Sequence, residues 1–287
     1  MKTRITLLLL LIACSVWGQN PFKKRQFLPN TVKEISGLCL INKDSILAIN
    51  DSGDQPILYY LNAAGQVYNQ VLLSQIQNKD WEALATDGSS IFIADFGNNC
   101  NCRTDLKIYQ IHPSGQIDSF SIVLPDQKVI KPSRAWMNYD LESLAYSHGS
   151  LHFFSKNKIQ AGNYYSKHYQ LELEHPQTIE LRDSFQFPEL VVTGAAFNPT
   201  GDECLVISYD FKLLLGFFPR SKTRLYHFYD FDNGAVFSGK SKTYRIGFLP
   251  IITQFESVDW IDDQHALIAS ERTGFIPARM KKIKLKR

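Results

Sequence analysis

The sequence predicts an all-β protein, a β-propeller of five four-stranded blades. Its 287 residues are 44% hydrophobic, which is enough to bury a core. The apolar residues fall into short runs separated by Gly-, Asn- and Asp-containing turns, and no segment shows a long 3.6-residue apolar period. A strand motif with one polar residue among apolar ones also recurs five times, at intervals of 46 to 63 residues, which is typical of propeller blades.

The repeating units supply their strands in the same order. The first strands are Ile35–Leu38, Trp81–Leu84, Leu141–Leu144, Val192–Ala195 and Phe255–Val258. The second strands, after a short turn, are Ile46–Asp51, Ile91–Asp95, Leu151–Lys156, Cys204–Asp210 and Ala266–Glu271. The third strands are Ile57–Asn62, Leu106–His112, Lys167–Leu173, Arg224–Asp230 and Ala278–Lys286. Four units continue into a fourth strand: Val67–Leu73, Ile117–Leu124, Ile179–Phe187 and Thr243–Phe248.

The fifth unit ends at Arg287 without a fourth strand, whereas Lys23–Leu28, before the first unit, is a strand without a partner. We expect Lys23–Leu28 to pair with Arg279–Leu285 and to close the ring, because closure removes two exposed sheet edges. The apolar stretch Lys212–Arg220 is interpreted as a loop insertion, and a sixth, degenerate blade is the alternative.

The N-terminus is typical of an export signal. Lys2 and Arg4 precede a Leu-rich segment, Ile5–Ala13, which is about half the length that a membrane span requires. Two endings are open. Cleavage after Gly18 would give a signal peptide of residues 1–18, whereas the lipobox-like sequence ending at Cys14 would place a lipid anchor on that residue.

The rest of the chain, 19–287, is expected to form a single exported domain, whether periplasmic, cell-surface or secreted. Lys and Arg number 31 and Asp and Glu 28, and the net charge of +3 falls to about +1 without Lys2 and Arg4. That balance argues against a nucleic-acid binder. No second long apolar run predicts a transmembrane span, and we expect a monomer.

Four cysteines follow the signal segment: Cys39, Cys100, Cys102 and Cys204. An even number permits two disulfides in an oxidising compartment. Cys100 and Cys102 flank one Asn in a polar loop, so they form either a local bridge or two free thiols. No further Cys or His stands at the spacing that a zinc site needs.

The first strands carry the residues that indicate a function. In a propeller these strands line the central channel, and side chains two positions apart share one face of a strand. The residues predicted to face the channel, one from each blade, are Ser36, Glu82, Glu142, Thr193 and Glu256. Two positions earlier stand Glu34, Asp80, Asp140, Val191 and Gln254.

Six of these channel residues are acidic, and their mutual repulsion needs compensation. Carboxylates that lie close together cannot all stay ionised unless protons, basic groups, water or a cation offset the repulsion. Oxygen ligands without a soft donor suit Ca²⁺. We therefore expect a Ca²⁺ site formed by the five one-per-blade residues. The alternative is a solvated channel whose acids bond to backbone N–H groups and water.

The second strands end at the channel mouth, where the first strands begin. This mouth collects further polar residues: Asn50–Asp54, Asp95–Asn99, Lys156–Lys158, Asp210 and Glu271–Arg272. Arg103 and Arg134 lie in loops on the same side. Asp51–Asp54 is interpreted as a polar turn, because it lacks the ligand spacing of an EF-hand loop. Acids with basic residues around them suit a small anionic ligand, such as phosphate, that a metal ion bridges.

Several short motifs resemble those of secreted propellers. They are Ile35–Leu38, Asn50–Ser52, Trp81–Leu84, Asp95–Asn99 and Ile268–Arg272. In these motifs the chain is similar to the SdiA-regulated and NHL-type propellers and to the esterase-like phytase group. The one-per-blade channel residues also resemble the channel ligands of the five-bladed calcium-activated apyrases. That resemblance implies a Ca²⁺ ion on the axis and hydrolysis of nucleoside di- and triphosphates.

Two functions are compatible with these features. The first is a non-catalytic module that binds a small anionic ligand or a surface partner, and the absence of a dedicated nucleophile favours it. The second is a Ca²⁺-dependent phosphoester or phosphoanhydride hydrolase. In that case Asp80, Glu82 or Glu142 would act as base, and Arg134 or Arg272 would stabilise developing charge.

Overall fold

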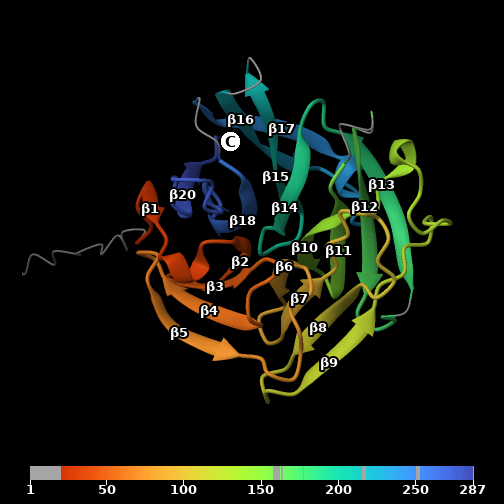
Figure 1. Ribbon diagram of the computed structural model, residues 1–287, viewed down its shortest axis with the longest axis horizontal. Coiled ribbons are helices and arrows are strands. Elements are labelled where there is room, and N and C mark those ends of the chain that lie inside the picture. Colours follow the sequence, from red (N-terminus) through yellow and green to blue (C-terminus); the bar gives the residue numbers. More distant parts are fainter. Residues whose placement is uncertain are drawn as a thin grey trace, which may run out of the picture.

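Five four-stranded antiparallel sheets surround a central axis as the blades of a propeller (Figure 1). The computed structural model describes residues 21–157, 162, 164–176, 178–214, 218–249 and 253–286. The predicted fold class, a five-bladed all-β propeller, is confirmed. The predicted signal segment 1–18, with Cys14, lies outside the described residues.

Each blade is a meander whose first strand lies nearest the axis. Blade 1 consists of β2 (Ile35–Asn42), β3 (Ser45–Asn50), β4 (Ile57–Asn62) and β5 (Val67–Leu72). Blade 2 consists of β6 (Trp81–Thr86), β7 (Ile91–Asp95), β8 (Lys107–Ile111) and β9 (Ile117–Ser121). Blade 3 consists of β10 (Leu141–Ser147), β11 (Ser150–Ser155), β12 (Tyr165–Glu172) and β13 (Ile179–Gln186). Blade 4 consists of β14 (Val191–Phe197), β15 (Glu203–Leu214), β16 (Phe218–Tyr229) and β17 (Lys240–Leu249).

Blade 5 takes its strands from both ends of the chain. It consists of β18 (Phe255–Asp262), β19 (His265–Ser270), β20 (Arg279–Lys284) and the N-terminal β1 (Arg25–Phe27). The antiparallel β1–β20 ladder pairs Arg25 with Lys281 and Phe27 with Arg279. The predicted ring closure is therefore confirmed, and β1 covers the outer edge of the last blade.

One apolar cluster fills each of the five interfaces between neighbouring blades. Trp81 lies fully buried between blades 1 and 2, and Trp260 is buried between blades 4 and 5. The blades thus pack face to face through the alternating apolar positions of their strands.

Among the residues that the structure describes, helical structure is limited to short 3-10 turns. Those described are η1 (Asn30–Val32), η2 (Arg134–Trp136) and η4 (Val236–Ser238). Within the described part of the chain, no helix has the length and apolar character to cross a membrane.

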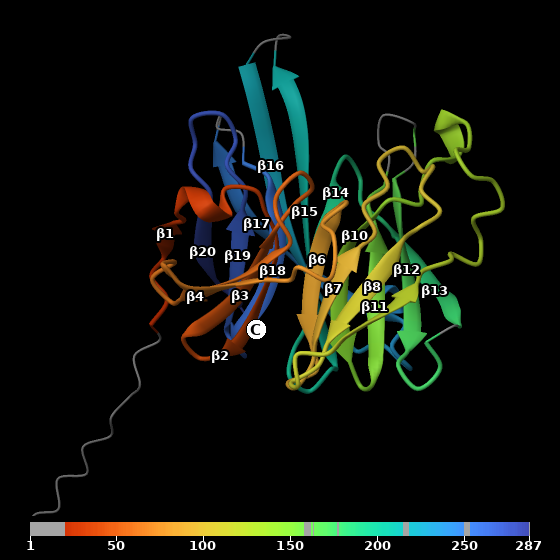
Figure 2. The same cartoon turned by 60° about the horizontal axis from the view of Figure 1, so that its bottom comes forward.

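The stretch Lys212–Arg220 belongs to a long hairpin, so its interpretation as a loop insertion was wrong. The β15–β16 ladder continues without a register shift from Glu203 opposite Tyr229 to Leu214 opposite Phe218. The two strands rise above the rest of the propeller on the channel-mouth side (Figure 2). An uninterrupted ladder is possible because no Gly, Pro, Asn or Asp stands between Asp210 and Leu214.

Candidate metal centre

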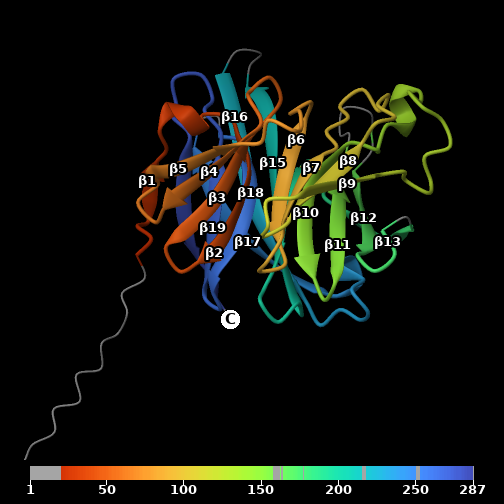
Figure 3. The ribbon, with the colours of Figure 1, turned by 90° about the horizontal axis from the view of Figure 1, so that it is seen from below.

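The five predicted channel residues occupy one structural position in all five blades. Each stands alone between two paired residues of its inner strand, so each is the extra residue of a β-bulge: Ser36, Glu82, Glu142, Thr193 and Glu256. A bulge bends the strand and re-aims one side chain out of the regular alternation. Each inner strand lies beside the inner strands of both neighbouring blades (Figure 1), so the bulges repeat around the channel. Figure 3 shows the propeller edge-on, with the inner strands β6 and β10 side by side.

Small residues follow the bulges because the blades approach closely there. A Cβ atom on Gly37 would lie 2.9 Å from the Leu84 nitrogen. A Cβ atom on Gly194 would lie 2.7 Å from the Glu256 carbonyl oxygen. Glycine at these two positions lets neighbouring backbones meet and narrows the channel directly below the bulges.

The two hydroxyl residues of the predicted Ca²⁺ set join neighbouring blades. Ser36 Oγ donates to the Trp81 carbonyl oxygen at 2.8 Å, and Thr193 Oγ1 donates to the Phe255 carbonyl oxygen at 2.8 Å. Thr193 lines the narrow part of the channel rather than the acidic cavity above it. The structure therefore gives both hydroxyls an interblade bond, and it places Thr193 in the narrow part of the channel, where Glu256 is the one acidic lining residue among those described.

An acidic cavity of about 200 Å³ lies at the mouth of the channel. Its charged lining residues are Glu34, Asp51, Glu82, Glu142, Glu256, Glu271 and Lys156. Ser36, Tyr209 and Gln254 add neutral polar groups. Among the described residues that line it, six carboxyl groups therefore face a single ammonium group.

One backbone hydrogen bond places the mouth residues in the same way in several blades. The residue after the second strand donates its N–H to the carbonyl oxygen two positions before the bulge. This bond joins Asp51 to Glu34 at 2.9 Å, Lys156 to Asp140 at 2.7 Å and Glu271 to Gln254 at 3.2 Å. Sequence analysis placed Asp51, Lys156 and Glu271 at the mouth but assigned none of them as a ligand, and it missed Tyr209.

Lys156 neutralises one side of the cavity. Its Nζ lies 2.9 Å from Glu142 Oε1, and the Glu142 side chain is almost fully buried. Burial alone would lower the pKa of Lys156, but Glu142 and the other surrounding carboxylates raise this pKa well above its usual value. Burial still holds the pKa of Glu142 well above its ordinary value despite the ion pair.

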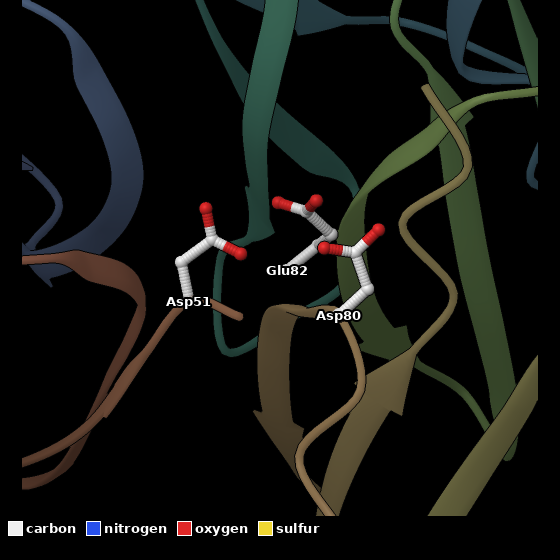
Figure 4. Close-up of side chains that lie close together, drawn as sticks. All are labelled: Asp51, Asp80 and Glu82. Atoms are coloured by element: carbon white, nitrogen blue, oxygen red, sulfur yellow. The ribbon is translucent and has the colours of Figure 1, made fainter. Parts of the chain in front are cut away.

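At the edge of the cavity lies an acidic cluster that we define as Asp51, Asp80 and Glu82 (Figure 4). Asp51 and Glu82 also line the cavity itself. One carboxylate oxygen from each residue lies within 4.8 Å of the others. Asp51 follows β3, Asp80 precedes β6 and Glu82 is the β6 bulge, so two blades contribute. The interpretation of Asp51–Asp54 as only a polar turn missed this role of Asp51.

The acidic cluster is short of positive charge. Burial and the neighbouring Asp51 raise the pKa of Asp80 to about 6, although Arg103 opposes the shift. Burial, Glu142 and Asp51 raise the pKa of Glu82 well above its usual value. The carboxylates of the acidic cluster lie close together, and the raised pKa values of Asp80 and Glu82 show that their ionised forms repel each other. A bound cation would relieve this repulsion.

Gly97 forms a wall of the acidic cluster. Its N–H donates to the Asp80 carbonyl oxygen at 3.2 Å. A Cβ atom at this position would lie 2.4 Å from both Asp80 Oδ2 and Glu82 Oε1. The two carboxylates therefore depend on glycine here for their positions, a requirement that the Asp95–Asn99 motif contained but that no sequence argument identified.

Arg103 fixes the loop behind Gly97. Its guanidinium donates to Asp95 Oδ1 at 2.9 Å and to the Gly97 carbonyl oxygen at 2.8 Å, and it lies 3.9 Å from Asp80 Oδ2. The Cys100–Cys102 disulfide closes the same loop, and of the two open alternatives the local bridge is observed. Arg103 thus supports the cluster from outside the cavity.

Arg134 and Arg272, the predicted charge-stabilising residues, do not line the cavity. Arg134 is exposed on η2, in the long connection between β9 and β10 that extends beyond the blades (Figure 2). Arg272 is exposed, and its Nε donates to the Gly274 carbonyl oxygen at 3.2 Å. The expected ring of basic residues around the acids is therefore reduced to Lys156, with Arg103 behind Asp80.

Comparisons with known proteins support the fold but assign no family. No protein-family model matches the sequence, and no curated protein matches it. Among solved structures, the chain is similar to the GH43 endo-arabinanase from Bacillus licheniformis, with a TM-score of 0.52 and 8% identity over 92% of this chain and 96% of that chain. At this identity the similarity shows a shared propeller fold. The SdiA-regulated, NHL-type, phytase and apyrase families that the short motifs resemble find no support here.

Proposed function

We propose that this protein is an exported, non-catalytic binding module whose channel mouth holds Ca²⁺ between Asp51, Asp80 and Glu82. The observation that carries the proposal is the approach of three carboxylates within 4.8 Å, two of which, Asp51 and Glu82, line a cavity with one lining ammonium group. This set replaces the five-residue ring expected from the sequence. The proposed ligand set retains Glu82 from that ring, and its other two ligands, Asp51 and Asp80, lie next to strand ends.

The donor set favours Ca²⁺ over other common metals. All three side chains offer oxygen, and neither His nor Cys lines the described part of the cavity. Ca²⁺ accepts six to eight oxygen ligands in irregular geometry, whereas Zn²⁺ prefers nitrogen and sulfur, and Mg²⁺ demands a regular octahedron. Water and a ligand would supply the remaining oxygens, and a small anionic ligand would reach the cavity through the cation.

Two features support an exported location. The N-terminal sequence has the charged and apolar regions of an export signal. The Cys100–Cys102 disulfide in the loop behind the acidic cluster is stable in an oxidising compartment.

A calorimetric Ca²⁺ titration of the chelator-treated protein tests the proposal. We expect one site, with binding weakened about tenfold or more in Asp80→Asn and Glu82→Gln because each removes a charged ligand. Glu172→Gln is the matched control, since Glu172 is exposed on β12, away from the cluster. Absence of binding, or equal binding by all variants, would contradict the proposal.

Metal-dependent phosphoester or phosphoanhydride hydrolysis is the second candidate. The observation that favours it is Asp80, a carboxyl group close to Asp51 and Glu82 that would accept a proton from water beside the cation. Lys156, rather than Arg134 or Arg272, is the basic group in the cavity. This candidate predicts that the protein releases phosphate from ATP in the presence of Ca²⁺ and that Asp80→Asn does not. If no phosphate is released, the non-catalytic binding module is the better proposal.

A further inference from the structure

A second cavity, of about 370 Å³, lies between blades 3 and 4 on the face opposite the acidic mouth. It is formed by the turns that follow β10, β14 and β16, together with residues of β11 and β12. Its polar and aromatic lining includes His148, Ser150, His152, Gln170, Asp202 and Phe231. This volume lies in the range of small-molecule sites.

A chain of buried side chains ends at this cavity. His168 Nδ1 lies 2.8 Å from Asp183 Oδ1, and His168 Nε2 lies 2.9 Å from His152 Nδ1. The other Asp183 oxygen accepts the Phe237 N–H at 2.9 Å. His152 and His168 are both almost fully buried.

The hydrogen bonds determine which nitrogen of each neutral ring carries the proton. A carboxylate accepts, so His168 Nδ1 donates to Asp183 and His168 Nε2 must accept. His152 Nδ1 therefore donates to His168, and His152 Nε2 keeps its lone pair. Burial lowers the pKa of both histidines, most strongly that of His152, which keeps the rings neutral. His152 thus offers the cavity an acceptor in a fixed orientation.

The other four blades show that the fold does not require this chain. Counting from the bulge, the positions equivalent to His152 are Leu47, Phe92, Leu205 and Leu267. The partners equivalent to His168 are Ile108, Leu225 and Met280 in blades 2, 4 and 5. Blade 3 has therefore replaced two core hydrophobic residues by a hydrogen-bonded pair. That replacement costs stability unless a hydrogen-bond donor reaches the remaining acceptor, His152 Nε2.

Gln170 lines the same cavity and carries a second acceptor, Oε1, directly behind Gly234 in the cavity wall. Its Nε2 donates to Ser150 Oγ at 2.9 Å, which fixes the orientation of the amide. Its Oε1 is buried and, among the described residues, has no hydrogen-bonding partner. A buried acceptor of this kind costs free energy until a donor reaches it.

We infer that this cavity binds a neutral, hydroxyl-rich ring, a monosaccharide or cyclic polyol unit, whose O–H groups donate to His152 Nε2 and Gln170 Oε1. The ring of Phe231 supplies an apolar wall beside these acceptors. A metal ion fits less well, because the only group of three or more close metal-ligating side chains in the described chain is the acidic cluster. The site is separate from the channel mouth and does not depend on Ca²⁺.

Histidine-detected ¹⁵N NMR of the full mature protein tests the inference, with D-glucose, L-arabinose and myo-inositol as probes at millimolar concentration. At least one probe should shift the His152 Nε2 resonance saturably, with and without chelator. The partly exposed His112 in blade 2 serves as internal reference. No saturable shift with any of the three probes would overturn the inference.

Two variants separate binding from folding. Gln170→Met should weaken probe binding about three- to tenfold, the effect of one neutral hydrogen bond. Gln110→Met is its matched control, because Gln110 has the same position in blade 2 and donates to Ser90 Oγ. His152→Leu installs the residue that blades 1, 4 and 5 carry, so it should fold and lose binding. Unchanged binding in Gln170→Met and His152→Leu would also overturn the inference.

Discussion

Gly97 tests the geometry of the acidic cluster without changing any charge. Gly97→Ala places a methyl group 2.4 Å from Asp80 Oδ2 and Glu82 Oε1, so both carboxylates must move. We expect about tenfold weaker Ca²⁺ binding and a stability loss of about 1–3 kcal/mol, measured by calorimetry and urea unfolding. Gly194→Ala is the control: it is also overpacked, but away from the cluster, and should lose stability while retaining Ca²⁺ binding.

Lys156 forms an ion pair with Glu142, and the contribution of this pair to stability depends on pH. Lys156→Met leaves a buried carboxyl group without its partner, which should cost about 3 kcal/mol when that group must ionise. Because the pKa of Glu142 is raised, the group can protonate at low pH, and the cost should shrink there. We expect the unfolding free energy of this variant to fall furthest below the parent at pH 8. An equal deficit at pH 5 and pH 8 would show that lost packing, not charge, dominates.

Glu271 gives the pH dependence of the empty cavity. Burial, Glu256 and Asp51 raise its pKa from 4.5 to about 8, so the folded state binds this proton more tightly than the unfolded chain. The contribution is favourable at low pH and is lost as the pH rises from about 4.5 to about 8. In chelator, Glu271→Gln should therefore gain stability relative to the parent across that window. Urea unfolding at several pH values measures the difference, and a gain independent of pH would refute the assignment.

At the residue scale, the sequence predicted the position of a site residue wherever the blade repeat keeps a constant register. The bulge residues stand at one register in all five blades, so Glu82 could be identified by alignment of the units alone. Asp51 and Gly97 lie in loops of differing length and composition, where no repeat fixes their direction. Their meeting with Asp80 depends on backbone contacts between blades, which no local pattern encodes.

At the element scale, β1 is the strand that closes the ring. Deletion of residues up to Leu28 removes its ladder with β20 and the buried side chains of Phe22 and Leu28. We expect a loss of about 3–6 kcal/mol, twice the value of one buried large side chain, together with aggregation through the open edge of β20. Thermal unfolding and light scattering measure both effects. A chain that begins at Pro21 and keeps β1 is the control, and equal behaviour of the two would contradict the role of β1.

Strand order and ring closure were predictable because each unit carries its own turn signals and the unpaired ends are complementary. The β15–β16 hairpin was not, because an apolar run without turn residues is compatible with an insertion or with longer strands. The ladder decides between them, since it pairs the two strands continuously up to Leu214 and Phe218.

At the scale of the whole molecule, the propeller brings loops from different blades to one mouth. Asp51 comes from blade 1 and Asp80 and Glu82 from blade 2, while Lys156 from blade 3 neutralises the far side. Glu142 thus has a close ion pair with Lys156, whereas Asp80 in the acidic cluster has only the longer ion pair, 3.9 Å, with Arg103. We therefore expect a Ca²⁺ ion to lie between Asp51, Asp80 and Glu82, where three carboxylates approach each other.

Anomalous scattering from crystals grown with Ca²⁺ shows whether an ion lies there. We expect one anomalous peak, at about 2.3–2.6 Å from carboxylate oxygens of Asp51, Asp80 and Glu82, and its disappearance in crystals of Asp80→Asn. A channel mouth without a peak, or a peak between Glu142 and Glu256 instead, would contradict it.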